Sequence, residues 1–138
     1  MIVLDTNVLS EVMKATPNNA VRKWMNRQYT AMLYITSVTL AENLFGIAIL
    51  PTGKRKDALS GALGDMLKIF AGKILPFDES AARCYAELAA QAQAAGKTLP
   101  PADGYIAAIA AAHRFVVASR DTAPFQAAGV DVINPWQG

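Results

Sequence analysis

The chain has 138 residues, of which 53% are hydrophobic and 17% charged, and its formal net charge is +2. This length and hydrophobic content predict one globular domain with a sizeable core and exclude a disordered chain. The single cysteine, Cys84, excludes an internal disulfide and fits a reducing, cytoplasmic compartment, whereas the small net charge neither demands nor excludes a nucleic-acid partner.

Short apolar strands alternate with helical patterns along the whole chain. Continuous apolar runs indicate strands, and apolar residues three and four positions apart indicate helices, with proline or glycine at their ends. In chain order, the predicted elements are a strand at 1–5, helices at 7–14 and 18–28, a strand at 32–36, a helix opening at Ser37 or Thr39 and ending near 50, a helix at 55–71, a strand at 73–77, helices at 79–95 and 101–113, and strands at 115–119 and 130–133.

The five predicted strands are apolar throughout instead of alternating between apolar and polar residues. Strands of this kind are buried on both faces, as in parallel sheets that helices cover on each side. Crossovers between parallel strands are right-handed in nearly all proteins, and the pattern predicts an α/β fold with three layers, α/β/α. No internal repeat or linker divides the chain, so a single domain over residues 1–138 is expected.

Glu42 is the only charged residue within 28–53, a composition that superficially suggests a membrane span. Polar residues interrupt this stretch, and Ser37 divides it into a strand-like part and a helix-like part. We therefore expect a strand followed by a buried helix in a soluble protein. No signal peptide is expected either, because Asp5 and Glu11 interrupt any apolar segment at the N-terminus.

Four acidic residues stand close to strand ends or helix starts. Asp5 ends the first strand, and Glu42 lies in the first turns of the helix after the second strand. Asp121 lies two residues past the fourth strand. These three places fall on the carboxyl edge of a parallel sheet, where ligands bind in open α/β folds. Asp103, in the first turn of the helix that Pro100-Pro101 starts, joins them if that helix begins at the same edge.

Each of these acids also has a purely structural interpretation. Asp5 has a residue type favoured at helix N-caps, and Thr39-x-x-Glu42 matches the capping-box pattern. Asp103 complements the dipole of its helix, an effect worth about 0.3–1 kcal/mol, and Asp121 suits a turn. Four separate structural roles would place all four acids at one edge only by coincidence, whereas a single binding site explains all four positions. This favours a common site. The other acids have ordinary positions on helix surfaces, at a cap or in a loop: Glu11, Asp57, Asp65, Asp78, Glu79, Glu87 and Asp131.

Four carboxylates in one crevice repel one another and titrate as a coupled set, and a divalent cation removes this repulsion. Ligands that are all oxygen favour a hard ion, Mg²⁺ or Mn²⁺, and no histidine or cysteine near these positions suggests zinc. Such sites act on phosphates, and the sequence has no glycine-rich phosphate loop of an NTPase. The chemistry indicated is hydrolysis of a phosphodiester by a metal-activated water, as in a nuclease.

The ordered motifs resemble those of the PIN-domain ribonucleases, in particular the VapC-type toxins of type II toxin–antitoxin systems. The resemblance covers nearly the whole chain. The segments that carry it are Ile-Val-Leu-Asp-Thr-Asn-Val-Leu-Ser-Glu at 2–11, Thr-Ser-Val-Thr-Leu-Ala-Glu at 36–42, Pro-Ala-Asp at 101–103 followed by Tyr-Ile-Ala-Ala, Val-Ala-Ser-Arg-Asp at 117–121, and Phe125, Gly129-Val130 and Val-Ile-Asn-Pro-Trp at 132–136.

The resemblance implies a PIN-like domain with a five-stranded, mostly parallel sheet, Mg²⁺- or Mn²⁺-dependent endoribonuclease activity on RNA, a homodimer and a cognate antitoxin. By position, the metal-binding and catalytic acids are Asp5, Glu42, Asp103 and Asp121. The hydroxyl groups of Thr6 and Ser119 orient the carboxylates and water. These two residues complete the implied site.

Two surfaces are predicted to contact partners. Arg120 stands beside Asp121, where a cation suits contact with an RNA phosphate. The helices within 7–28 and 38–71 are apolar on more than one face, which indicates a groove or interface, although a buried core helix has the same pattern. The resemblance implies that an antitoxin peptide lies in such a groove and blocks the acidic site.

Two alternative functions share parts of this pattern. A non-catalytic PIN-like interaction module is favoured by an incomplete acidic set, and here the set is complete. A receiver-like phosphoacceptor domain has a similar order of strands and helices. It requires a second acid beside Asp5, where the sequence has Asn7, together with an isolated acceptor aspartate and a late lysine, and this arrangement is not evident.

Overall fold

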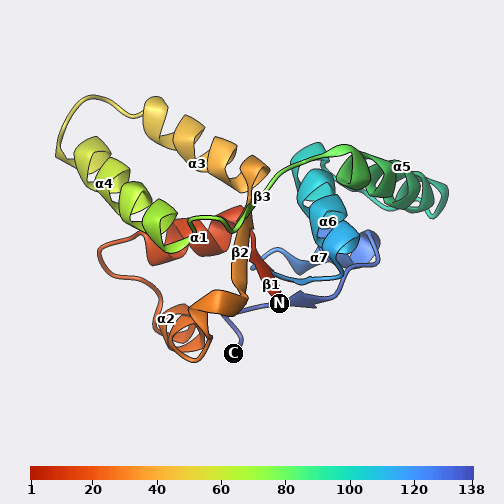
Figure 1. Cartoon of the computed structure of the whole chain (residues 1–138), viewed down its shortest axis with the longest axis horizontal. Helices are drawn as coiled ribbons and strands as arrows, with labels where there is room; N and C mark the ends of the chain where they lie inside the picture. The colour runs from red at the N-terminus through yellow and green to blue at the C-terminus, as the bar shows by residue number, and fades with distance from the viewer.

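One sheet of five parallel strands organises the chain, and the computed structural model describes all residues 1–138. The strand order is β3-β2-β1-β4-β5, so the first strand lies at the centre (Figure 1). The strands are β1 (Ile2–Leu4), β2 (Leu33–Thr36), β3 (Ile74–Leu75), β4 (Val116–Ala118) and β5 (Val132–Ile133). This confirms the predicted α/β class, and the sheet is parallel throughout.

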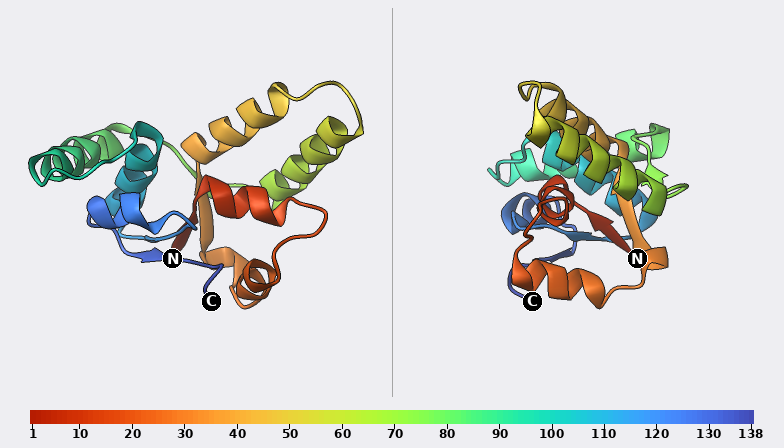
Figure 2. Two further views of the ribbon diagram at one scale, coloured as in Figure 1. Left: turned by 180° about the vertical axis from the view of Figure 1, so that it is seen from behind. Right: turned by 90° about the vertical axis from the view of Figure 1, so that its left-hand side faces the viewer.

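Helices flank both faces of the sheet (Figures 1 and 2). Helices α1 to α4 lie on one side, whereas α6 and α7 lie on the other with α5 packed on α6. The helices are α1 (Thr6–Val12), α2 (Asn19–Asn26), α3 (Ser37–Ala48), α4 (Lys54–Ile69), α5 (Glu79–Ala94), α6 (Pro101–His113) and α7 (Thr122–Ala127), and a 3₁₀ turn covers Thr30–Met32.

Neighbouring residues of the central strands enter opposite halves of the core. Val3 packs with α6 and α7, whereas Leu4 packs with α1 and α4, and both are fully buried. Val117 and Ala118 of β4 divide in the same way. Because side chains alternate across a strand, an apolar run fills both layers of core. The three-layer prediction is therefore confirmed.

Two local predictions were wrong. Helix α7 was missed because Pro124 interrupts the sequence pattern, yet proline is tolerated in the first turn of a helix, where its missing N–H costs no hydrogen bond. Helix α3 is not a buried core helix, because Leu44 and Phe45 expose 50% and 65% of their surface, and Ile49 at its C-cap exposes 66%. No helix in the structure has the length and apolar character needed to cross a bilayer.

Candidate active site

The carboxyl ends of three adjacent strands meet at the point where the strand order reverses. From β1 the sheet continues to β2 on one side and to β4 on the other. Such a switch point is where open α/β sheets bind ligands, because the connections leave in opposite directions and open a crevice. Asp5 follows β1, and Ser119 follows β4. The helix that carries Glu42 follows β2.

Asp5 is nearly buried, with 3% of its surface exposed, at the junction of β1 and α1. One carboxylate oxygen accepts a hydrogen bond from the Thr6 amide (2.8 Å), and the other accepts one from the Ser119 hydroxyl (2.7 Å). The Asp5 amide donates to the Ala118 carbonyl (2.9 Å), which ties the residue to β4. The strand pairing and two hydrogen bonds therefore fix the carboxylate.

Asn7 joins the ends of β1 and β4, a role that the sequence reasoning missed. Its amide nitrogen donates to the Ser119 hydroxyl oxygen (3.2 Å), and its carbonyl oxygen accepts from the Arg120 amide (3.2 Å). Ser119 is fully buried, and its oxygen also accepts from the Asp121 amide (3.0 Å). In the sequence, this role is indicated only by the type and place of Asn7, a short polar residue two positions after Asp5.

Glu42 is not the partner in a capping box. The N-cap of α3 is Thr36, whose hydroxyl accepts from the Thr39 amide (3.0 Å), so Thr39 lies inside the helix. The Glu42 carboxylate instead accepts a hydrogen bond from the Thr6 hydroxyl (2.6 Å), 36 positions earlier in the chain. This bond connects α3 to the residue that follows Asp5.

Asp103 and Asp121 approach the crevice from the side of β4. Asp103 lies in the first turn of α6 and is partly buried. Asp121 is exposed at the N-cap position of α7, but its side chain makes no capping hydrogen bond. The charge of Asp121 raises the pKa of Asp5, and the charges of Asp5 and Asp121 raise the pKa of Asp103. Helix α6 thus begins at the same edge of the sheet.

The four acids influence one another electrostatically. Burial, together with the negative charges of Asp5, Asp121 and Glu42, raises the pKa of Asp103 to about 6. Burial also raises the pKa of Asp5, even though its hydrogen bonds from Ser119 and Thr6 oppose the change. Perturbed carboxyl groups in a crevice are typical of functional sites.

The donor chemistry of this site fits a hard divalent cation. All four side chains offer carboxylate oxygens, which Mg²⁺ and Mn²⁺ prefer, and their mutual repulsion is the energy that a bound cation relieves. As they lie in the structure, however, no three or more His, Cys, Asp or Glu side chains are placed so that they could hold a metal ion together. The carboxylates therefore share one electrostatic environment without being drawn together around one point.

The raised pKa of Asp103 makes the stability of the metal-free protein depend on pH. The folded chain binds the proton of the Asp103 carboxyl group more tightly (pKa about 6) than an unfolded chain does (pKa 3.8). The resulting stabilisation is present below the unfolded pKa and is lost as the pH rises through the folded pKa. The full shift corresponds to about 3 kcal/mol, which partial exposure to solvent reduces to on the order of 1 kcal/mol.

Asp103→Asn is therefore expected to melt a few degrees above the wild type in EDTA near pH 7.5, with the difference vanishing near pH 4. Calorimetry across this range measures it. Asp65→Asn, on an exposed position of α4, is the matched control and should follow the wild-type curve. If the difference in melting temperature between Asp103→Asn and the wild type did not change with pH, the charge of Asp103 would not be what destabilises the metal-free protein.

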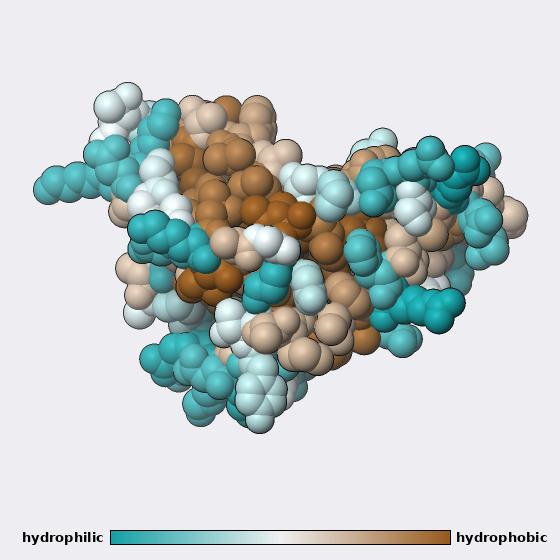
Figure 3. Space-filling view, viewed as in Figure 1, coloured by the Kyte–Doolittle hydropathy of each residue, from teal (hydrophilic) through white to brown (hydrophobic).

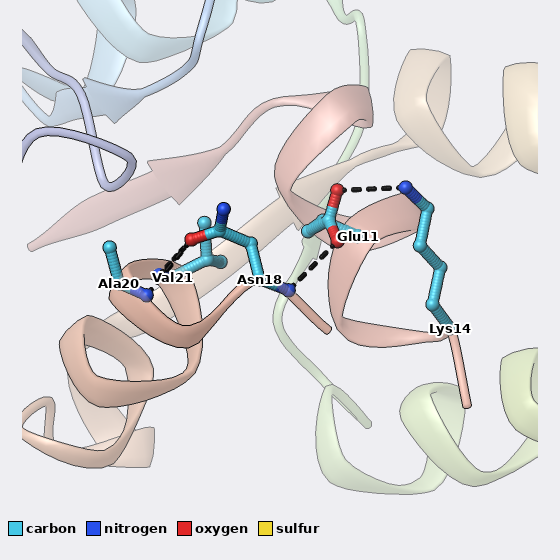
Figure 4. Close-up of polar contacts among 5 residues, drawn as sticks. All are labelled: Glu11, Lys14, Asn18, Ala20 and Val21. Carbon is cyan, nitrogen blue, oxygen red and sulfur yellow. Dashed lines mark hydrogen bonds and ion pairs between the residues drawn. The ribbon is translucent and has the colours of Figure 1, made fainter. Parts of the chain in front are cut away.

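Glu11 differs from its predicted position on a helix surface, because only 7% of it is exposed. One carboxylate oxygen accepts a hydrogen bond from the Lys14 ammonium group (3.0 Å), and the other accepts one from the backbone amide of Asn18 (3.0 Å) (Figure 4). Burial raises the pKa of Glu11, but these hydrogen bonds and the charges of Lys14 and Arg120 outweigh it, so the pKa lies below its ordinary value. Glu11 thereby fixes the turn between α1 and α2.

Comparisons with known proteins identify the family of the chain. The PIN domain family profile matches residues 2–130. The chain is 54% identical over 138 residues to VapC ribonuclease Y4jK of Sinorhizobium fredii and 46% identical over 137 residues to toxin FitB of Neisseria gonorrhoeae, covering 99% of both chains in each case. It superimposes on the crystal structure of FitAcB from Neisseria gonorrhoeae with a TM-score of 0.95 and 45% identity, covering all of both chains. The chain therefore belongs to the PIN domain family, among its VapC-type members.

Proposed function

We propose that this chain is a Mg²⁺- or Mn²⁺-dependent endoribonuclease and acts as the toxin of a toxin–antitoxin pair. The observation that carries the proposal is the placement of Asp5, Glu42, Asp103 and Asp121, from four separate segments, within one electrostatic environment at the switch point of the sheet. The printed names of two full-length relatives, a VapC ribonuclease and a toxin, support the substrate class and the biological role.

In this proposal the four acids hold the divalent ion, and Asp5 has the most rigid position among them. When bound, the ion lowers the pKa of a water and stabilises negative charge at the cleaved phosphodiester. The Ser119 hydroxyl holds one oxygen of Asp5, and the Thr6 hydroxyl holds one oxygen of Glu42. These bonds restrict the carboxylates to a few orientations, as hydroxyl partners of metal ligands do in other sites.

Arg120 is the proposed contact for an RNA phosphate next to the acids. Its guanidinium group lies over the ring of Trp136, 5.3 Å from the ring centroid, and its amide donates to Asn7. A cation–π contact restricts a long side chain without neutralising its charge. Because Arg120 stands between Ser119 and Asp121 in the chain, we propose that it supplies the positive charge that an RNA backbone needs on this side of the site.

The exposed apolar face of α3 and α4 is the proposed contact surface for the antitoxin. Leu44 and Phe45 on α3 and Ile49 at its C-cap are exposed, and Figure 3 shows hydrophobic atoms gathered over α3 and α4. An apolar patch that the chain's own core does not cover is typical of an interface. We also propose a homodimer and a cytoplasmic location, in which the single cysteine stays reduced.

The alternatives separate clearly from this proposal. The receiver-like interpretation has no support, because the PIN family matches residues 2–130. The non-catalytic interaction module remains the competing PIN function. It predicts partner binding without RNA hydrolysis, so an activity assay distinguishes it from the ribonuclease.

The proposal is tested by incubating the purified chain, without antitoxin, with a mixed RNA substrate in Mg²⁺, Mn²⁺ or EDTA. We expect cleavage with either metal, its loss in EDTA, and its return when Mg²⁺ is added in excess. Cleavage that EDTA leaves unchanged would contradict the metal dependence. RNA that stays intact with both metals would favour the interaction module.

A further inference from the structure

A cavity of about 480 Å³ lies directly beside the acidic site. Its volume falls within the range of about 300–1,000 Å³ that is typical of small-ligand sites. Asp121 lines this cavity and is also one of the four acids, so the cavity borders the acidic site. The lining residues come from the loop between α5 and α6 and from α7: Lys97, Thr98, Pro100, Asp121, Ala123, Pro124, Gln126 and Ala127.

The two walls of this cavity have fixed backbones. Gly96 adopts a φ of +68°, which ends α5, and the Lys97 amide then donates to the Ala92 carbonyl (2.9 Å). On the opposite wall, Phe125 is fully buried and anchors α7 to the core, so the next residue, Gln126, is held at the surface. Lys97 and Gln126 therefore extend from positions that the fold determines.

The lining combines three kinds of contact that a nucleotide uses. Lys97 supplies a positive charge for a phosphate. Gln126 supplies an amide that can donate and accept hydrogen bonds at a base edge. Pro100, which is exposed, supplies an apolar surface for a sugar or a base. The negative charge of Asp121 at the cavity edge repels a free anion. A nucleotide within an RNA strand is the better occupant, because a cation bound by the neighbouring acids would offset this repulsion.

We propose that this cavity is a subsite for one nucleotide of the RNA strand adjacent to the cleaved phosphodiester, with Lys97 on the phosphate and Gln126 on the base. The subsite rests on the proposed ribonuclease function and adds a determinant of sequence preference to it. Bases in single-stranded RNA are free to present their edges in this way, since they are not paired.

The test is cleavage of a single-stranded RNA pool with randomised positions around the cut, followed by sequencing of the products. The variants are Gln126→Ala and Gln126→Glu, with Gln91→Ala on an exposed position of α5 as the control. Wild type and control should share a base preference at one position next to the cut. Both Gln126 variants should change it, by about tenfold for the loss of one hydrogen bond.

Lys97→Ala should raise KM for a defined RNA by roughly three- to tenfold, as expected for one lost phosphate contact. Lys68→Ala, at an exposed position near the end of α4, should leave KM unchanged. If Gln126 and Lys97 variants keep the wild-type base preference and KM, the subsite is refuted while the ribonuclease stands. If the wild type itself leaves the RNA pool intact, the ribonuclease and the subsite both fall.

Discussion

Asp5→Asn and Asp103→Asn should each lower the rate of RNA cleavage by about 10²–10⁴-fold near pH 7.5. Asp5 is the acid that strand pairing and two hydrogen bonds hold in place, and Asp103 is the acid whose pKa its three acidic neighbours help to raise. Replacing either carboxylate by a neutral amide removes one negative charge and one strong ligand for a cation. The initial rate of cleavage of a defined RNA in saturating Mg²⁺ measures the loss.

The stability of the same variants separates lost chemistry from lost structure. Asparagine has nearly the shape of aspartate and still accepts a hydrogen bond from the Thr6 amide at the start of α1. Removing repulsion among the acids should leave Asp103→Asn as stable as the wild type or more stable in EDTA. In Asp5→Asn the loss of one acceptor, for the buried Ser119 hydroxyl, offsets this gain, so its melting temperature should stay near that of the wild type. Asp65→Asn should cleave RNA at the wild-type rate. Cleavage at that rate by both site variants, free of contaminating nuclease, would overturn the assignment of the site.

Phe45→Asp should weaken binding of the cognate antitoxin by at least about 30-fold, which corresponds to the loss of a contact worth about 2 kcal/mol or more. Phe45 is 65% exposed on α3, so the substitution creates no cavity and buries no charge in the folded chain. Within an apolar interface, however, the carboxylate loses its water without gaining a partner. Calorimetric titration with the purified antitoxin measures the change in affinity.

Tyr29→Asp provides the matched control for the interface prediction. Tyr29 is an exposed aromatic residue, at 81%, but it precedes the 3₁₀ turn and lies outside the apolar face of α3 and α4. Its substitution should leave the affinity for the antitoxin unchanged. Antitoxin binding by Phe45→Asp with wild-type affinity would show that this face is not the contact surface.

The fold and the candidate acids could be predicted because they depend on local pattern and simple topology. Strands that are apolar throughout indicate a sheet covered on both faces, and parallel strands bring their carboxyl ends to one edge. Asp5 follows β1 directly and Asp121 lies in the loop after β4, so this rule places both without further information. Glu42 and Asp103 follow from helices that start at the same edge.

Other features depend on contacts between distant residues, which no local pattern contains. The Thr6–Glu42 hydrogen bond joins residues 36 positions apart, and the Asn7–Ser119 bond joins residues 112 positions apart. Glu11 resembled an ordinary surface acid, because its burial depends on how the turn after α1 closes over it. The apolar sequence of α3 likewise does not indicate whether this chain or a partner covers the helix.

Anomalous X-ray diffraction from crystals of the chain soaked in Mn²⁺ locates the ion without assuming an activity. We expect a Mn²⁺ peak in contact with the carboxylates of Asp5 and Asp103, with Glu42 and Asp121 around it, and no such peak in Asp5→Asn or Asp103→Asn crystals. Mn²⁺ that binds elsewhere on the chain and leaves this crevice empty at saturating concentration would contradict the assignment of the four acids as metal ligands.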